Sequence, residues 1–376
     1  MTETISDSKQ IDKIQADYKK LPSKIWLKTI GFTLVFLFIL VIGTIATFCS
    51  IALYKTNQFR IAAKLDWKEL SNIITQTLER KPISKYDRKN ILLLGTDELS
   101  NRENHPVFTD TMMLLSIDLN SGKIYTLAIP RDLWLDDYKT KINALYIYGK
   151  DRYPEKPELF PQTIVSGLTG VEIHHSVIMS LDQLSQIIDL IGGVNIEIQE
   201  SFTDDQFPRT DADISSNNPE ELYETISFEK GDEKMSGARA LKYIRSRHAQ
   251  GQEGNDLARS RRQQQVISAL VSQLSNFNTL KNTSTLGQLY FFYQTNFNKY
   301  LDTIELASTI KTLIPQRNNI EFSAQSLSIY PEDKMGVLTH PATKDYDDQW
   351  VYIVRDELKL KEEIKNKLNL DSPVNE

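Results

Sequence analysis

One apolar stretch dominates the N-terminal part of the chain. Residues 29–54 contain no Asp, Glu, Lys or Arg and consist mainly of Phe, Leu, Ile, Val, Ala and Thr. A helix needs about 20 apolar residues to cross a bilayer, so this stretch predicts one transmembrane helix. The polar segment before it is too long for the first region of a signal peptide, and no small-residue cleavage pattern follows a short apolar core. We therefore expect a permanent anchor in the cell membrane.

The charges beside this stretch predict its orientation. Its N-terminal flank carries Lys19, Lys20, Lys24 and Lys28, and its C-terminal flank carries Lys55, Arg60 and Lys64. Because basic residues favour the cytoplasmic side, the more basic N-terminal flank predicts a cytoplasmic tail over residues 1–28. The rest of the chain is then expected outside the cytoplasm.

The segment after the anchor has the period of an amphipathic helix. Apolar residues recur at three- and four-residue steps over 55–80, at Phe59, Ala63, Trp67, Leu70, Ile74 and Leu78, and Pro82 follows. This spacing predicts a single helix with one apolar face. Such a helix could pack on the domain or lie near the lipid headgroups, and we assign residues 55–86 to a stalk.

Three short apolar runs follow the stalk and predict strands. They cover 91–94, 111–117 and 123–129, and turn residues such as Gly95 separate them. Continuous apolar runs of this length are typical of strands that are buried on both faces. Because helical patterns follow at 160–168 and 181–191, we predict an α/β fold with a central sheet covered by helices on both faces.

The second half of the chain alternates between polar and helical segments. Residues 194–198 alternate as a strand does, and 201–226 are polar and acidic, which predicts a surface loop. Helices are expected over 237–244 after an N-cap at Ser236, then over 256–276, 289–313 and 357–368, with two weaker strands between the last two. We assign 87–275 to the main domain and expect 276–376 to complete it.

Composition limits the possible functions. The 376 residues carry a formal charge of −6, with 40% hydrophobic and 25% charged residues, as in ordinary globular proteins. Without a basic excess, we expect no general nucleic-acid partner. The single cysteine, Cys49, excludes an intrachain disulfide and a Cys-rich zinc site. The sequence also lacks a G-x-x-x-x-G-K-[ST] loop and a G-x-S-x-G elbow, which disfavours nucleotide-driven and serine-hydrolase chemistry.

Basic residues are nevertheless concentrated in one segment. Between positions 239 and 262 the chain has seven, Arg239, Lys242, Arg245, Arg247, Arg259, Arg261 and Arg262, against the two acids Glu253 and Asp256. Arg245 and Arg247 would point the same way in an extended segment, and Asp256, Arg259 and Gln263 share one face of a helix. Directed guanidinium groups suit a phosphate pocket. A solvated charged surface is the alternative that the spacing leaves open.

Two aspartates suggest a metal site. Asp97 follows the first predicted strand and Asp110 opens the second, so an antiparallel pairing would bring both carboxylates to one end of the sheet. Hard oxygen ligands together with substrate phosphates are what Mg²⁺ prefers. Turn-forming aspartates are the alternative reading. Arg131 adds a cation at the end of the third strand.

The succession of these motifs resembles the LytR-CpsA-Psr family. The segments that carry the resemblance cover residues 90–270 in order and include Ile91-Leu92-Leu93-Leu94-Gly95-Thr96-Asp97, Asp110-Thr111-Met112, Ile129-Pro130-Arg131-Asp132, Lys141-Ile142-Asn143-Ala144, Ile191-Gly192-Gly193-Val194, Met235-Ser236-Gly237, Tyr243-Ile244-Arg245-Ser246-Arg247-His248 and Asp256 through Arg259 to Arg262-Gln263. The chain departs from the family pattern at Phe108 and Leu99, where members usually have arginine.

The resemblance implies a fold, a substrate and roles for single residues. The expected fold is a mixed sheet between two helical layers, with an apolar tunnel for a polyprenyl tail. The expected activity is the transfer of a phosphoglycan, such as teichoic acid or capsule, from a polyprenyl-pyrophosphate carrier to a peptidoglycan hydroxyl. By position, Asp97 and Asp110 would hold Mg²⁺, Arg131, Arg245, Arg247, Arg259 and Gln263 would bind the pyrophosphate, and Arg262 would be a further contact. We expect Asp97, Asp110, Arg131 and Arg245 to serve catalysis.

Two other functions remain open from the sequence. A lipid-binding regulator of the cell envelope would hold the same carrier without turnover, and a pyrophosphatase would use water as the acceptor. In the transferase, Mg²⁺ and the arginines would neutralise the charge that spreads over the pyrophosphate oxygens. Loss of Asp97 and Asp110 would abolish the transferase or the pyrophosphatase activity. A regulator that only binds the carrier would keep its role in the cell envelope.

Overall fold

The computed structural model describes residues 4–96, 107–209 and 218–370. The chain divides into two compact units, Met1–Gln58 and Phe59–Glu376. The first unit consists of most of helix α1 (Thr4–Ala62), in which the stretch Trp26–Ala62 is long and apolar enough to cross a membrane. That stretch contains the predicted anchor 29–54. The description below concerns the second unit.

The predicted single helix over 55–80 is wrong, because the structure has a break inside it. Helix α1 ends at Ala62, Lys64 adopts a left-handed conformation with φ 57°, and α2 begins at Trp67 and ends at Glu79. A capping box starts the new helix: Glu69 N donates to Asp66 Oδ1 at 2.7 Å, and Asp66 N donates to Glu69 Oε2 at 2.8 Å. The apolar period runs through the break and therefore does not reveal it.

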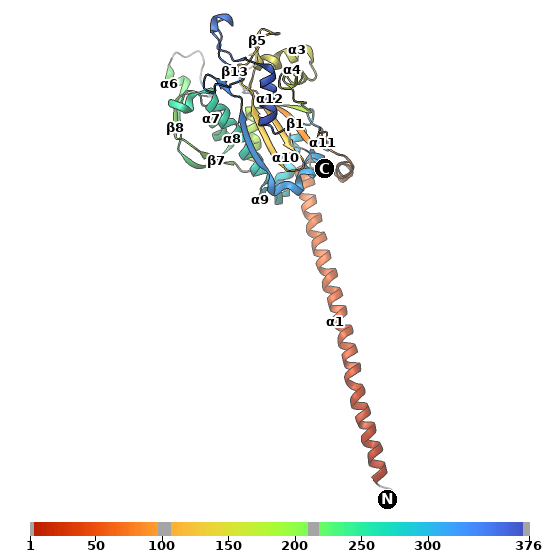
Figure 1. Cartoon of the computed structure of the whole chain (residues 1–376). Helices are drawn as coiled ribbons and strands as arrows, with labels where there is room; N and C mark the ends of the chain where they lie inside the picture. The colour runs from red at the N-terminus through yellow and green to blue at the C-terminus, as the bar shows by residue number, and fades with distance from the viewer. Residues whose placement is uncertain (1–3, 97–106, 210–217, 371–376) are drawn as a thin grey trace. The chain divides into compact units, whose positions relative to one another are not determined.

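A five-stranded mixed sheet forms the centre of the unit and confirms the predicted fold class (Figure 1). Its strands, in spatial order, are β11 (Glu321–Ser326), β3 (Lys123–Ala128), β2 (Thr109–Asp118), β1 (Arg88–Thr96) and β6 (His175–Ser180). The central strands β3, β2 and β1 pair antiparallel, whereas the outer strands β11 and β6 pair parallel with their neighbours. Strand β11 comes from the C-terminal quarter, so this region completes the sheet.

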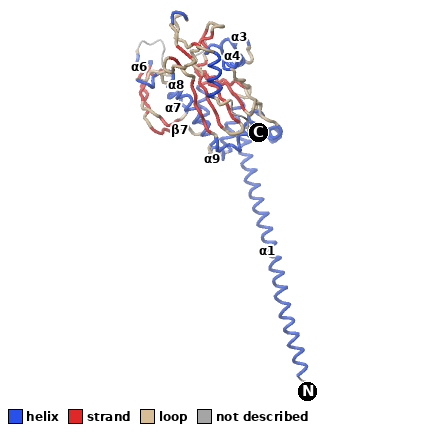
Figure 2. The backbone as a smooth tube through the Cα atoms, viewed as in Figure 1, coloured by secondary structure: helices blue, strands red, loops and turns tan. Residues whose placement is uncertain are grey.

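Helices cover both faces of the sheet, and Figure 2 shows the strands gathered among them. One face carries Leu92, Leu94 and Leu114, all fully buried in a core shared with α3 (Leu145–Arg152), α4 (Leu159–Thr169) and α12 (Glu357–Lys367). The opposite face packs against α5 (Leu181–Leu190) and α8 (Asp256–Ser275). Side chains alternate between these two faces along each strand.

The polar segment 201–226 is not a surface loop as predicted. It contains strand β8 (Phe202–Pro208), the short helix α6 (Pro219–Leu222) and the start of β9 (Tyr223–Phe228), which pairs antiparallel with β8. Three of its apolar residues, Phe202, Phe207 and Ile226, are buried in a second core. The same core includes the strands β7 (Val194–Ile198) and β10 (Gly231–Met235) and the helix α7 (Gly237–Arg245). Acidic residues between the apolar ones hide the strand pattern in the sequence.

The predicted helix 289–313 is also divided in the structure. Helix α10 spans Thr283–Asn296 and α11 spans Thr303–Leu313, with Asp302 as the N-cap of α11. The remaining elements are β4 (Trp134–Leu135), β5 (Thr140–Lys141), α9 (Phe277–Lys281), β12 (Ile329–Tyr330), β13 (Leu338–Thr339), β14 (Ile353–Val354) and the 3-10 helices Ile142–Ala144, Gly251–Gly254, Ile314–Asn319 and Thr343–Asp345.

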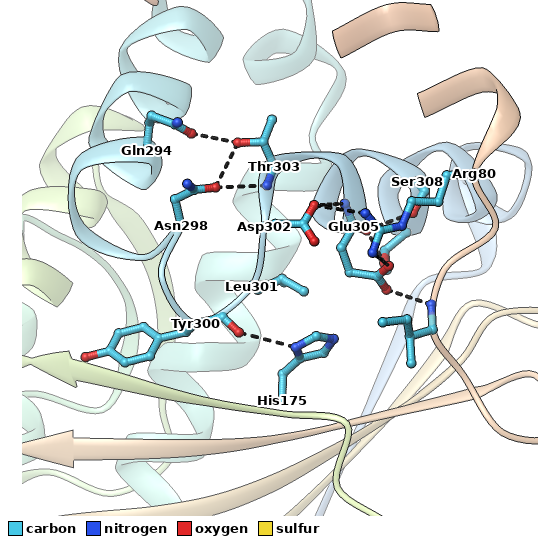
Figure 3. A network of polar contacts seen from close by, with 12 residues as sticks. Arg80, His175, Gln294, Asn298, Tyr300, Leu301, Asp302, Thr303, Glu305 and Ser308 are labelled. Carbon is cyan, nitrogen blue, oxygen red and sulfur yellow. Dashed lines mark hydrogen bonds and ion pairs between the residues drawn. The ribbon is translucent and has the colours of Figure 1, made fainter. Parts of the chain in front are cut away.

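A buried ion pair ties α11 to the segment that follows α2. Glu305 and Lys89 pair with both side chains fully buried, and Arg80 Nη2 lies 3.3 Å from Glu305 Oε2. The backbone N–H of Ile83 donates to Glu305 Oε1 at 2.7 Å. Figure 3 shows Glu305 and Arg80 directed toward each other across this junction. Arg80 also pairs with Asp302, and Lys311 donates to carbonyl oxygens of α2 and of Arg80, so several contacts fasten this segment to α11.

Candidate active site

A β-bulge places Asp110 at the end of the central sheet. In the antiparallel pair β1–β2, Gly95 lies opposite Thr111 and Thr96 lies opposite Thr109, so Asp110 is the extra residue. Such bulges redirect a side chain out of the strand ladder. Gly95 suits this approach, because a Cβ atom there would lie 2.9 Å from Cβ of Thr111. The carboxylate of Asp110 therefore lines a cavity of about 160 Å³.

Two arginines pair directly with Asp110. Arg131 Nη1 donates to Asp110 Oδ1 at 2.8 Å, and Arg247 Nη2 donates to Oδ2 at 3.0 Å. Arg131 follows the end of β3, whereas Arg247 follows α7, more than a hundred positions later in the chain. Figure 1 shows that their elements belong to different parts of the unit. The structure therefore brings together three of the residues predicted from separate motifs.

Three further predicted residues line the same cavity. They are Arg245 at the last position of α7, and Arg259 and Gln263 one turn apart on α8. Arg259 is almost fully buried, with 4% of its surface exposed. The predicted common face of α8 is confirmed for Arg259 and Gln263. Arg245 and Arg247 do reach one cavity, although Arg245 is helical rather than part of an extended segment as predicted.

The arginines keep Asp110 ionised. Burial alone would raise the pKa of this carboxyl group, but the charges of Arg131 and Arg247, the hydrogen bond from Arg131 and the charge of Arg259 lower it below its ordinary value. Among the described residues, three arginines thus act on one carboxylate, and Arg245 lines the same cavity. The excess positive charge suits an anion with several oxygens, such as a pyrophosphate.

Asp204 is a site residue that the sequence reasoning missed. Its fully buried carboxylate accepts hydrogen bonds at Oδ2 from Ser246 Oγ at 2.7 Å, Arg247 N at 3.0 Å and His248 N at 3.1 Å. Its Oδ1 accepts from Gln206 N at 3.1 Å. Asp204 therefore fixes the backbone that carries Arg247. The signal in the sequence that could have identified Asp204 is an acidic residue between the apolar residues Phe202 and Phe207.

Arg262 has a structural role and not the predicted substrate contact. Its side chain is 1% exposed and donates to the carbonyl oxygens of Tyr243 at 2.9 Å and Ser246 at 2.7 Å. Its Nη1 also pairs with the Glu253 carboxylate at 2.8 Å. These contacts hold the end of α7 against α8. Arg262 therefore stabilises the packing of α7 on α8. The spacing of the basic residues in the sequence does not distinguish such a structural arginine from one that contacts a ligand.

An apolar crevice adjoins the arginine cavity. Its lining includes Leu93, Met179, Leu181, Leu184 and Ile267, between the sheet and the helices α5 and α8. The two spaces share lining residues, among them Gly95, Thr111 and Gln263. Other side chains on this face of the sheet, Ile91, Leu115 and Val177, are only partly buried. This apolar surface suits the end of a hydrocarbon chain, but the crevice has a volume of only about 40 Å³, so a longer chain would require the helices to move away from the sheet.

The described residues are compatible with one Mg²⁺ beside Asp110. No group of three or more His, Cys, Asp or Glu able to hold a metal occurs in the part of the chain that the structure describes. Mg²⁺ does not require one, since it often binds through one or two carboxylates, water and substrate phosphates. The Asp110 oxygens keep lone pairs beyond the two arginine bonds. The second predicted ligand, Asp97, lies outside the described residues. Of the two positions where the chain departs from the family pattern, Leu99 also lies outside them, and Phe108 is 43% exposed.

Comparison with solved structures supports the fold. A Streptococcus agalactiae protein superposes with a TM-score of 0.52 at 20% identity, covering 78% of this chain and 90% of that one. TagV of Bacillus subtilis superposes with a TM-score of 0.50 at 18% identity, covering 77% of this chain and all of that one. The likeness extends over the mixed sheet and its helices.

Sequence comparison identifies the family. The polyisoprenyl-teichoic acid–peptidoglycan teichoic acid transferase TagU of Oceanobacillus iheyensis is 28% identical over 274 residues, which cover 72% of each chain. The regulatory protein MsrR of Staphylococcus aureus is 28% identical over 221 residues, covering 57% of this chain and 58% of that one. The model of the LytR-CpsA-Psr family matches residues 53–369. This chain belongs to the LytR-CpsA-Psr family.

Proposed function

We propose that this protein transfers a phosphoglycan from a polyprenyl-pyrophosphate carrier to a sugar hydroxyl of peptidoglycan. The observation that carries the proposal is the junction of the arginine cavity with the apolar crevice. One ligand that is both strongly anionic and long and apolar would occupy both spaces. The name of the TagU relative, a teichoic acid transferase that acts on peptidoglycan, agrees with this assignment.

In this proposal the arginines bind the pyrophosphate and stabilise its charge. Arg131, Arg245, Arg247 and Arg259 bind the pyrophosphate oxygens and stabilise the charge that develops on them during transfer. The acceptor oxygen forms a bond to the glycan-side phosphorus and loses its proton. The bond from that phosphorus to the bridging oxygen breaks, and polyprenyl phosphate leaves. Gln263 positions the substrate at the opening of the crevice.

We also propose that Mg²⁺ takes part, held by Asp110 and Asp97. When bound, the ion would neutralise further charge on the phosphates. Asp110 suits this role because its arginine partners keep its pKa low, so its carboxylate stays anionic. Arg131 and Arg247 would also orient the Asp110 carboxylate through their hydrogen bonds at 2.8 and 3.0 Å.

The lipid tail explains why such a domain is anchored. Each CH₂ group removed from water contributes about 0.8 kcal/mol, so a polyprenyl chain strongly prefers a membrane or an apolar crevice. The helix α1 would keep the domain beside the bilayer that supplies the carrier. We propose that the N-terminus is cytoplasmic and that residues 59–376 lie outside the cytoplasm.

The decisive experiment measures release of polyprenyl phosphate by the full-length protein in detergent or vesicles. The substrate is a polyprenyl-pyrophosphate glycan, with or without peptidoglycan fragments, and with Mg²⁺ or a chelator. We expect release that depends on Mg²⁺ and glycan that appears on the fragments. Release that ignores the fragments would indicate a pyrophosphatase, and binding without any release would indicate a regulator.

Two variants locate the activity in the arginine cavity. Arg131→Ala removes one directed donor, and we expect kcat to fall by about a hundredfold or more. Arg317→Ala is the matched control, because Arg317 is exposed and belongs to the 3-10 helix Ile314–Asn319. Equal activity of the two variants would contradict the assignment.

A further inference from the structure

A second groove adjoins the arginine cavity and extends beyond it. Asp110, Arg131, Arg259, Asn255 and Tyr352 line its near part. Its far part has a volume of about 940 Å³, and its lining still includes Arg131 and Arg247. Among the described residues, this far part shares no lining residue with the apolar crevice. The arginines therefore lie between two spaces of different chemical character.

Aromatic and polar side chains mix in the far part of this groove. Trp350 and Tyr352 line it with ring centroids 4.6 Å apart and ring planes at 77°. Trp350 is 40% exposed, although large aromatic side chains are usually buried. The polar residues of the lining are Asn255, Ser326, Ser328, Glu332, Asp333 and Lys367. An aromatic face among hydrogen-bonding groups suits a sugar ring, which has an apolar C–H face and a rim of hydroxyls.

The backbone fixes this aromatic pair beside the catalytic arginine. Tyr352 N donates to the Asp132 carbonyl at 2.9 Å, and Trp134 N donates to the Tyr352 carbonyl at 2.8 Å. Both bonds fall immediately after Arg131 in the chain. Val351, which lies between these two residues in the chain, is fully buried, and its carbonyl oxygen lies 2.8 Å from Nδ1 of His340. The His340 ring lies 4.7 Å from the Trp350 ring and supports it. The pair is thus a rigid platform at a set position relative to Arg131.

The order of these spaces identifies which sugar the platform holds. In phosphoryl transfer the attacking and leaving oxygens lie roughly in line on opposite sides of the phosphorus. The leaving polyprenyl phosphate belongs with the apolar crevice, so the attacking hydroxyl approaches from the other side. The sugar rings of an acceptor strand are therefore expected in the far part of the groove, beside Arg131 and Arg247.

We propose that Trp350 and Tyr352 form a subsite that binds a hexose ring of the acceptor glycan. The proposal rests on the transferase function proposed above and names the part of the site that selects the acceptor. Ring stacking on Trp350 would hold the acceptor strand, and the hydroxyl rim would bond to the polar lining. Trp350 is a positioning and specificity residue, because it acts on the acceptor without touching the phosphates.

The test compares Trp350→Ala and Trp350→Phe in the full-length protein. At saturating carrier, we expect Trp350→Ala to raise the KM for peptidoglycan glycan fragments about tenfold, which corresponds to about 1.4 kcal/mol of binding free energy. The KM for the carrier should not change. Trp350→Phe keeps an aromatic face and should restore most of the acceptor affinity. Tyr223→Ala is the control, because Tyr223 is similarly exposed at 38% and lies at the start of β9.

A binding measurement separates this proposal from the proposed function. Equilibrium dialysis of the glycan fragments against each protein needs no turnover. Weaker binding by Trp350→Ala than by the unmodified protein supports the subsite even if no transfer is detected. Equal fragment binding by the two proteins overturns it. A rise in the carrier KM with an unchanged acceptor KM also overturns it, because the platform would then hold the donor glycan.

Discussion

At the scale of single residues, the position of Arg247 depends on Asp204. The three donors at Asp204 Oδ2 belong to Ser246, Arg247 and His248, so one carboxylate sets the path of the chain beside the arginine cavity. Burial would raise the pKa of Asp204, but these hydrogen bonds and that from Gln206 lower it below its ordinary value. A charged acceptor is needed because all four partners are donors.

Asp204→Asn tests this dependence. An amide has only one acceptor oxygen, so its NH₂ group must face a donor, and we expect the free energy of unfolding at pH 7 to fall by about 2–4 kcal/mol. Because the folded pKa of Asp204 lies below the unfolded value of about 3.9, its stabilisation is complete above that pH and disappears as the pH falls through the folded pKa. Denaturant titration at pH values from 7 to below about 3.9 should show the difference in unfolding free energy between the two proteins shrink.

The neighbouring Asp205 provides the control for this measurement. Its side chain is exposed, so Asp205→Asn should unfold at the same denaturant concentration as the unmodified protein. If Asp204→Asn has unchanged stability and unchanged carrier affinity, Asp204 does not fix the position of Arg247.

At the scale of elements, breaks and bulges decide where functional residues lie. The bulge in β2 turns Asp110 into the cavity, and the end of α7 separates Arg245 from Arg247. Ion pairs between elements that are distant in the sequence also fix the positions of those elements. The buried Lys89–Glu305 pair joins β1 to α11, and Arg80 adds the segment after α2. Burial lowers the pKa of Lys89, while its hydrogen bond and ion pair with Glu305 oppose that shift.

Lys89→Met tests the coupling between these elements. The substitution leaves the fully buried Glu305 carboxylate without one partner, and breaking such a pair typically costs about 3–5 kcal/mol. We expect the double variant Lys89→Met with Glu305→Gln to recover part of this loss, since no unpaired charge remains. Thermal unfolding of the two variants measures both effects.

An exposed ion pair serves as the comparison. Lys85 pairs with Glu172 at 2.8 Å, with both side chains more than half exposed. Solvent screens such a pair, so Lys85→Met should leave the melting temperature almost unchanged. A similar loss in Lys85→Met and Lys89→Met would show that burial of the second pair does not matter.

At the scale of the whole molecule, the anchor and the domain have separate physical requirements. Most of the span Trp26–Ala62 is exposed, and such an apolar helix surface is stable in an apolar solvent. The unit Phe59–Glu376 has its own cores and polar surface. The lipid-linked substrate proposed above would require both, because its tail is soluble in the bilayer and its head group suits the arginine cavity.

Protease treatment of intact cells tests the proposed orientation. We expect externally added protease to degrade residues 59–376 and to leave a tag fused before Thr4 intact until the cells are permeabilised. The lysines before the anchor provide the physical reason, since they favour the cytoplasmic side. Degradation of the tag in intact cells, with protection of the domain, would reverse the assignment.

The sequence by itself determined the anchor, the central strands and the chemical type of the site. Long apolar runs such as 29–54 and 111–117 are local signals, and the order of the Asp and Arg motifs placed the chain in its family. Local caps were also readable, because Ser236 precedes α7 as predicted. These features depend on neighbours within a few positions, which a sequence displays directly.

Only the tertiary structure decided which arginines line the cavity and which contacts hold them in place. Arg262 and Arg259 are both buried on α8, yet Arg262 binds carbonyl oxygens of α7 while Arg259 lines the cavity. Asp204 and Tyr352 are held by contacts with segments more than 40 positions away. Spacing records which residues share a face of one element, but burial and partners depend on the elements that pack against it. The function of a charged side chain is therefore set by long-range packing.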